Sequence, residues 1–217
     1  MIELLTLKDC SQLVPNEISD EQRIHVLSNG TMHNVDEFLA AYGVKSDVRC
    51  SVVIEPFNCI EQFIIQNKAI NYYAVVSLVF DGIEMADMAE FAVRVKDITD
   101  MCGLSDSTYY FIGVPIYSWL SREQKHNLRQ INSDLKAAIE TVGNAHFIDL
   151  EPYVLKFGEQ NVFHDRFLFS SKVSFKELLI SSLSQQIVRL IFWARSSAKK
   201  CFVVDCDNTL WGGVIGE

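Results

Sequence analysis

The stretch Tyr73-Ala74-Val75-Val76-Ser77-Leu78-Val79-Phe80 decides the fold class of this chain. Its side chains are almost all apolar, so both faces of the strand that it predicts must be covered by other parts of the protein. A strand of this kind is typical of the centre of a parallel sheet with helices packed on both faces. The sequence therefore predicts an α/β fold.

Strand and helix patterns alternate on both sides of this central strand. Asn34, with Glu37 at the capping-box position, predicts a helix start, and Gly43 predicts its end. A second capping box, Ser121-Arg122-Glu123-Gln124, predicts a long amphipathic helix. The remaining predicted strands are 23–28, 48–55, 109–114 and 146–150, and the predicted helices are 34–43, 60–66, 85–101, 121–142 and 175–193. We expect a five-stranded parallel βα sheet of SGNH or flavodoxin type, with its strand order left open.

The end of the chain carries the strongest candidate for chemistry. Phe202-Val203-Val204 predicts a short buried strand, and Asp205 and Asp207 follow where it would give way to a loop. Two carboxylates at this spacing suit phosphoryl transfer, with Asp205 as the nucleophile and Asp207 as the acid and base. Both carboxylates would bind Mg²⁺, because two negative charges beside a phosphate must be neutralised. The Thr209 hydroxyl could fix the loop by bonding to local backbone.

Other interpretations of this segment can be compared with the sequence. A calcium loop of EF-hand type needs Gly at its sixth position, where Leu210 stands. A Walker-B aspartate needs a G-x-x-x-x-G-K-[ST] loop upstream, and none of the glycines begins one. The neighbouring carboxylates should raise the pKa of Cys206 and so weaken it as a nucleophile. An acidic strand-to-loop junction without chemistry is the remaining alternative.

The segment Asp205-Cys206-Asp207-Asn208-Thr209-Leu210-Trp211-Gly212-Gly213-Val214-Ile215-Gly216-Glu217 resembles the first motif of haloacid-dehalogenase (HAD) phosphatases. It is more narrowly similar to the FkbH-like subfamily, in which the aspartate motif continues as N-T-L-W-G-G-V-I-G-E. Residues 55–62 and 163–175 also resemble stretches that precede the HAD domain in this family. The resemblance implies a Mg²⁺-dependent enzyme that acts on a phosphorylated small molecule, with Thr209, Trp211 and Gly212 in a substrate loop. Known members load a glyceryl unit from a phosphorylated three-carbon donor onto an acyl carrier protein and release phosphate.

The resemblance also implies a division into domains. We expect an SGNH-hydrolase-like domain over residues 1–195, a hinge at 196–200 that includes Lys199 and Lys200, and the first strand of a HAD-like, Rossmann-type domain at 201–217. The later HAD motifs, with the Ser/Thr, the Lys and the acidic pair, would lie beyond Glu217. The 217-residue chain alone is therefore expected to lack useful phosphatase activity.

The expected first domain has its own candidate site. Ser28 follows the first strand, where an SGNH hydrolase places its nucleophile, and Asn58 and Asp165 are possible partners. However, the exit of strand three has no Asn, and Asp165-Arg166-Phe167-Leu168 carries Leu where the family requires His. Without an imidazole base Ser28 has no activator, so we favour a turn-capping role for it. Other polar groups expected at the carboxyl ends of the strands are Asn29, Thr31, Asp81 and Tyr117.

Three histidines bear on these alternatives. His33 and His164 could activate Ser28 only if the fold brings them close to it, whereas His25 is expected to be a partly buried strand residue. Two further functions stay open for this domain: a non-catalytic binding or recruitment module, and an esterase or acyltransferase that uses Ser28.

Composition restricts the partners. The formal net charge of −9 argues against an extended nucleic-acid surface and would require an acidic carrier protein to dock on a local basic patch. We expect no membrane span and no signal peptide, because the apolar runs are short and the N-terminus lacks a basic head. The six cysteines show no C-x-x-C spacing, so we expect reduced thiols in the cytoplasm.

Overall fold

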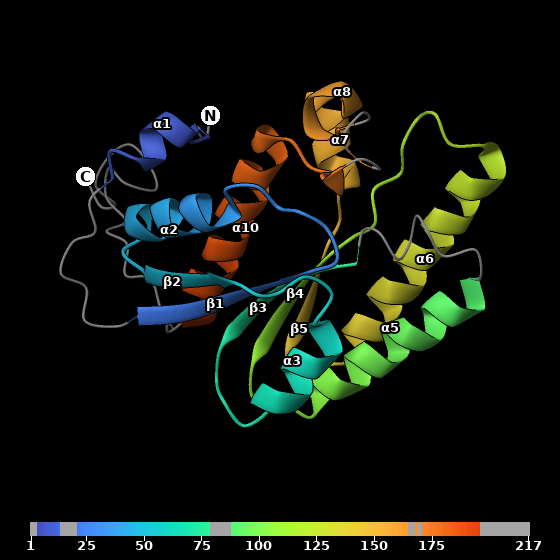
Figure 1. Cartoon of the computed structure of the whole chain (residues 1–217), viewed down its shortest axis with the longest axis horizontal. Coiled ribbons are helices and arrows are strands. Elements are labelled where there is room, and N and C mark those ends of the chain that lie inside the picture. Colours follow the sequence, from blue (N-terminus) through green and yellow to red (C-terminus); the bar gives the residue numbers. More distant parts are fainter. Residues whose placement is uncertain (1–3, 14–20, 79–87, 165–167, 169–170, 196–217) are drawn as a thin grey trace, which may run out of the picture.

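The computed structural model describes residues 4–13, 21–78, 88–164, 168 and 171–195. Its centre is a five-stranded sheet in which every pairing is parallel, with the strand order β2-β1-β3-β4-β5 (Figure 1). The strands are β1 (Glu21–Ser28), β2 (Arg49–Ile54), β3 (Tyr73–Ser77), β4 (Thr108–Ile112) and β5 (Ala145–Ile148). The predicted fold class is confirmed, and the structure adds the strand order.

The middle strand of the sheet is buried in the core of the domain. Ala74, Val75 and Val76 of β3 are fully buried, as the continuous apolar pattern of this strand predicts. β2 lies at one edge of the sheet, and its residues are exposed or half-buried. Because β3 pairs with β1 on one side and β4 on the other, it occupies the position that its sequence predicts.

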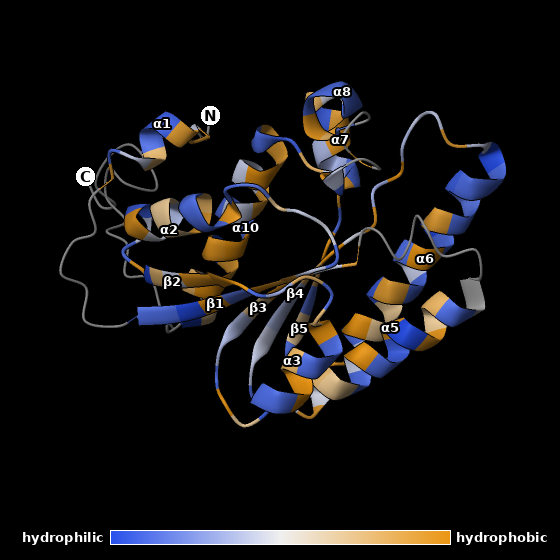
Figure 2. Cartoon of the chain, in the orientation of Figure 1, coloured by the Kyte–Doolittle hydropathy of each residue, from blue (hydrophilic) through white to orange (hydrophobic). Residues whose placement is uncertain are grey.

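Helices cover both faces of the sheet. One face carries α2 (Val35–Lys45) and α10 (Glu177–Arg195), which pack against each other (Figure 1). The other face carries α3 (Ile60–Asn67), α5 (Met88–Gly103) and α6 (Arg122–Glu140). Figure 2 shows both hydrophobic and hydrophilic residues on α6. The buried residues of this helix recur at helical spacing and form its hydrophobic face: Leu128, Ile131, Leu135 and Ile139.

The start of α2 at Asn34 is confirmed, but the predicted capping box and the predicted end at Gly43 are wrong. Asn34 is the N-cap residue but has a left-handed backbone, with φ of 57°, and its side chain makes no capping hydrogen bond. The expected capping box with Glu37 is therefore wrong, whereas the box of Ser121 and Gln124 at the start of α6 is confirmed. The helix also continues past Gly43 to Lys45. Gly43 is needed for close packing instead, because a Cβ there would lie 2.5 Å from the carbonyl oxygen of Val48.

Among the helices of the described ranges, the short α1 (Leu7–Cys10), α7 (Glu151–Phe157) and α8 (Glu159–Val162) were not predicted from the sequence. The segment before α1 is held by a buried network, in which the Tyr42 hydroxyl accepts a hydrogen bond from Leu5 N at 2.8 Å and bonds Ser181 Oγ at 2.9 Å. The Ser181 hydroxyl in turn donates to Leu5 O at 2.8 Å. The start of the chain is thus part of the α2–α10 layer.

The last helix begins at Glu177 rather than at Phe175. Phe175 instead forms an isolated antiparallel bridge with Phe163, and both side chains are buried. No helix within the described ranges is long and apolar enough to cross a membrane. The predicted hinge at 196–200 and the predicted strand at 202–204 lie outside the described residues.

Candidate functional site

The strand order places one candidate site at the carboxyl ends of β1 and β3. β1 and β3 are neighbours in the sheet, and the chain leaves β1 toward β2 on one side but leaves β3 toward β4 on the other. Such a switch point opens a crevice at the carboxyl edge of a parallel sheet, and ligands bind there in folds of this order. Ser28 and Ser77 are paired at this edge, and Asn29 N donates to Ser77 O at 3.3 Å.

The Ser28 side chain serves a structural purpose at this edge. Only 8% of the residue is exposed, and its hydroxyl oxygen accepts a hydrogen bond from Gly30 N at 3.0 Å. This is a local turn-capping contact of the kind that serine makes after a strand. The geometry agrees with the turn-capping role that we favoured from the sequence.

Asn58 is brought next to Ser28, as the sequence analysis expected. Its backbone N donates to Ser28 O at 3.2 Å, and its backbone is left-handed, with φ of 58°. Its side-chain oxygen accepts a hydrogen bond from Arg94 Nη2 at 3.3 Å, and Arg94 Nε pairs with Glu61 Oε1 at 2.6 Å. The amide oxygen of Asn58 is therefore engaged by an arginine of α5 rather than left for a substrate.

The Arg94 pair also sets the charge of Glu61. Burial pushes the pKa of Glu61 upward, but the hydrogen bond and positive charge of Arg94 outweigh it, so the pKa lies below its ordinary value. Glu61 is thus a permanent anion near neutral pH. It helps to hold Arg94 against the loop between β2 and α3.

A late segment of the chain closes the other side of the β1 loop. Thr31 N donates to Lys172 O at 2.7 Å, and Thr31 forms a parallel bridge with Val173. Lys172 has a left-handed backbone, with φ of 51°, and its ammonium lies 5.2 Å from the centre of the Phe57 ring. Segments 28–31, 57–58 and 171–173 therefore meet at one edge of the sheet.

The histidines considered for hydrolysis have different surroundings in the structure. Leu168, at the position where an SGNH hydrolase requires His, is fully buried at 0% exposure. His33 is exposed before α2, while His164 is half-buried and its backbone N donates to Ser174 O at 2.9 Å. His25 is a partly buried strand residue, as expected: its Nδ1 lies 2.6 Å from Glu55 Oε1, and its ring contacts Phe63.

The predicted polar group Tyr117 and a thiol that was not predicted, Cys59, complete the description of this edge. Tyr117 is fully buried and packs against Trp119 and Phe163, with ring centroids 5.4 and 5.1 Å apart. Cys59 lies at the start of α3, and burial, followed by the charge of Glu55, raises its thiol pKa. A thiolate nucleophile is therefore disfavoured at this edge.

The remaining predicted site residues lie outside the described residues. These are Asp81, Asp165, Lys199, Lys200, Asp205, Cys206, Asp207, Thr209, Trp211 and Gly212. Over the ranges that the structure does describe, no cluster of three or more His, Cys, Asp or Glu side chains could hold a metal ion. The Mg²⁺ pair Asp205 and Asp207 stays a prediction, because both residues lie outside the described ranges.

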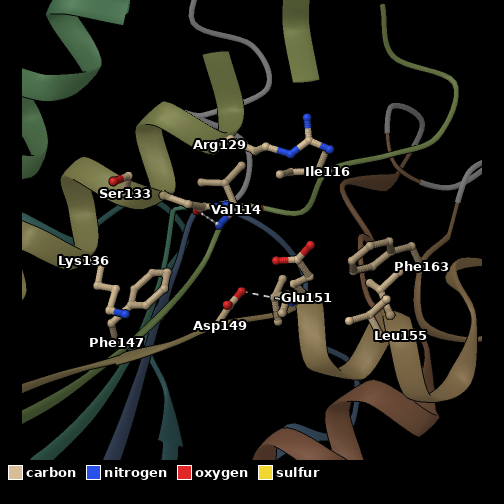
Figure 3. A pocket seen from close by; sticks show the side chains of 13 residues that line it. Val114, Ile116, Arg129, Ser133, Lys136, Phe147, Asp149, Glu151, Leu155 and Phe163 are labelled. Carbon is tan, nitrogen blue, oxygen red and sulfur yellow. Dashed lines mark hydrogen bonds between the residues drawn. The ribbon is translucent and has the colours of Figure 1, made fainter. Parts of the chain in front are cut away.

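The sequence analysis missed a concave region at the carboxyl ends of β4 and β5 (Figure 3). It is an open pocket of about 440 Å³ between α6 and α7. Its polar side chains are Arg129, Asn132, Ser133 and Lys136 of α6, with Asp149 and Glu151 opposite. The signal was present in the sequence as polar residues at helical spacing, together with Asp149 directly after a strand.

Solved structures share this fold. The chain is similar to the N-terminal part of BF1531 from Bacteroides fragilis, which contains a phosphatase domain and is complexed with Mg (TM-score 0.71, 16% identity). That match covers 99% of this chain and 63% of the other, so this chain spans less than two thirds of that structure. No protein-family model and no curated protein sequence matches the chain.

Two hydrolases show the same architecture. A lipase/acylhydrolase from Enterococcus faecalis matches with a TM-score of 0.54 and 12% identity, over 80% of this chain and 96% of that chain. The esterase EstA from Pseudoalteromonas sp. matches with a TM-score of 0.54 and 9% identity, over 81% and 100%. Likeness at these identities shows the fold alone. The described part of the chain has an SGNH-hydrolase-like fold.

Proposed function

We propose that this chain is the N-terminal part of an FkbH-like HAD-type phosphatase or phosphate-displacing transferase. In this proposal Asp205 and Asp207 carry the chemistry, and the SGNH-like domain of residues 1–195 is a non-catalytic module. The observation that carries it is the string Asp205–Glu217 directly after a domain of this fold. The similarity of 99% of the chain to a protein that contains a phosphatase domain supports the same arrangement.

The two aspartates divide the chemistry. Asp205 attacks phosphorus and forms an aspartyl-phosphate, while the bond to the leaving oxygen breaks and Asp207 gives that oxygen a proton. Asp207 then takes a proton from the water that hydrolyses the intermediate. Mg²⁺ held by both carboxylates would offset the negative charge that gathers at the phosphoryl group.

Two contacts support a non-catalytic first domain. The Ser28 hydroxyl accepts the Gly30 N–H, and the position of the expected histidine is the buried Leu168. A serine without an imidazole base is not an effective nucleophile. The module then serves to bind or recruit, with a phosphorylated small molecule as the substrate of the HAD site and an acyl carrier protein as the acceptor of the glyceryl unit.

The test uses the longer protein in which the HAD domain is complete. Asp205→Asn should abolish phosphate release, because it removes the nucleophile. Asp207→Asn should lower the rate by about a hundredfold or more, because proton transfer is lost. Ser28→Ala is the matched control in the first domain and should leave phosphate release unchanged. Normal turnover in Asp205→Asn would end the proposal.

The domain boundary has its own test. Residues 1–195 should fold alone, because the described strands and helices form a sheet covered on both faces. Hydrogen exchange on the 217-residue chain should show weaker protection at residues 202–205 than in β3, whose centre is buried. Equal protection would assign residues 202–205 to the first sheet and move the boundary.

A further inference from the structure

We propose that the pocket between α6 and α7 binds a small zwitterion with an apolar body. The simplest such ligand is an α-amino acid with a large apolar side chain. The inference uses residues of the described domain only, so it does not depend on the phosphoryl chemistry proposed for Asp205 and Asp207. A pocket of about 440 Å³ is within the range of roughly 300–1,000 Å³ that small-molecule sites occupy.

The walls of the pocket are fixed without a ligand. The Asn132 side chain accepts a hydrogen bond from Val114 N at 2.7 Å and donates one to Val114 O at 2.8 Å, which ties α6 to the loop after β4. Gly113 leaves room for this contact, since a Cβ there would lie 3.4 Å from Asn132 Oδ1 and 3.0 Å from Phe147 Cζ of the neighbouring strand. On the opposite wall Asp149 Oδ1 accepts a hydrogen bond from Glu151 N at 3.0 Å. Sites with such fixed walls lose little ordering entropy on binding.

Opposite charges face each other across the opening. Figure 3 shows Arg129 on the α6 side of the opening and the carboxylate of Glu151 on the opposite side, with Lys136 also on the α6 side, next to Phe147, and Asp149 beside Glu151. Within the described part of the chain, Arg129, Asp149 and Glu151 belong to no ion pair, and Lys136 makes only an exposed contact of 3.9 Å with Glu140. An exposed contact of this kind is worth little. The charges are therefore available to a ligand that enters between them.

The charge arrangement selects the class of ligand. A simple anion would be attracted by Arg129 but repelled by Asp149 and Glu151. A simple amine would be attracted by Asp149 and Glu151 but repelled by Arg129. A zwitterion satisfies both walls, because its carboxylate can take the guanidinium in a bidentate contact while its ammonium donates to the carboxylate opposite.

The apolar part of the pocket accounts for the body of the ligand. Val114, Leu150 and Phe163 line the pocket and are almost fully buried, so they present a dry floor. Leu155 at the same pocket is 81% exposed. A large apolar side chain between the floor and Leu155 would remove the exposed leucine surface from water. Glycine, which has both charges but no apolar body, should therefore bind much more weakly.

The experiment titrates the 217-residue chain with L-phenylalanine and follows backbone amide resonances by NMR. We expect saturable shifts at the pocket with a Kd on the order of 1 mM. N-acetyl-L-phenylalanine lacks the ammonium and phenethylamine lacks the carboxylate. The Kd of each should be higher than that of L-phenylalanine by about tenfold or more, because one charged hydrogen-bonding group is lost.

Two variants test the assigned walls. Arg129→Gln and Glu151→Gln should each raise the Kd for L-phenylalanine by about tenfold. The control variants Arg122→Gln and Glu123→Gln, on the exposed first turn of α6, should leave this Kd unchanged. All four side chains are exposed, so melting curves should coincide with the wild type. Absence of binding at about ten times the expected Kd would overturn the proposal. Equal binding of the three phenyl ligands, or no effect of the two pocket variants, would also overturn it.

Discussion

Replacement of Ser28 by Ala tests the proposed role of the candidate site in two independent ways. The hydroxyl of Ser28 accepts one hydrogen bond, from Gly30 N at 3.0 Å, at a position that is 8% exposed. A hydrogen bond of this kind contributes about 0.5–1.5 kcal/mol net to the free energy of unfolding. Gly30 is half-buried, so water can partly replace the lost acceptor, and we expect a loss of about 1 kcal/mol. For a domain of this size that lowers Tm by about 2–4 °C.

A second buried serine, Ser184, is expected to change the free energy of unfolding in the opposite direction when it is replaced by Ala. Ser184 lies inside α10 and is fully buried, and its hydroxyl has no hydrogen-bond partner in the described part of the protein. Ser184→Ala removes an unsatisfied polar group and adds the better helix former, so it should raise the free energy of unfolding by up to about 1 kcal/mol. Thermal unfolding followed by circular dichroism measures both variants.

The same Ser28→Ala protein is then assayed with an aryl ester. We expect the background rate of hydrolysis to be equal in the wild type and in Ser28→Ala, because the structure gives the hydroxyl a turn-capping bond. A rate that falls in Ser28→Ala but not in Ser184→Ala would refute the reasoning and restore the esterase hypothesis. Equal Tm shifts of the same sign in both variants would refute the hydrogen-bond assignment.

Two further predictions concern stability. Gly43→Ala should destabilise the domain by about 1–3 kcal/mol despite its better helix propensity, because the new Cβ would lie 2.5 Å from Val48 O, a backbone atom that cannot move aside. Gly103→Ala in α5, where the nearest atom would be 3.7 Å away, should instead stabilise by up to about 1 kcal/mol, and urea unfolding of both variants measures the contrast. The folded pKa of Glu61 is lowered, so the contribution of its pair with Arg94 is present above the unfolded pKa of about 4.3 and is lost as the pH falls through the folded pKa. The Tm difference between wild type and Glu61→Gln should therefore be larger near pH 7 than near pH 3, and a difference that grows in acid would contradict the assignment.

Local patterns were sufficient for most of the fold. The apolar β3 segment predicted a central parallel strand, and the structure places β3 between β1 and β4. The capping box at Ser121 predicted the start of α6, because its side-chain contacts span only three residues. Prediction failed where packing between elements decides the outcome. Gly43 looked like a helix end but is held inside α2, where β2 approaches too closely for a side chain.

For the candidate sites, too, some features followed from the sequence and others only from the tertiary structure. The sequence by itself determined the Asp205–Glu217 motif and the absence of a histidine at Leu168, because both depend on residue identity and short spacing. Only the tertiary structure decided that Asn58, Thr31 and Lys172 meet beside Ser28, because hydrogen bonds between separate loops join them. It also decided that Arg129 faces Glu151 across a pocket (Figure 3). Their meeting depends on the β4–β5 pairing and on the packing of α6 and α7, which no local pattern in one sequence encodes.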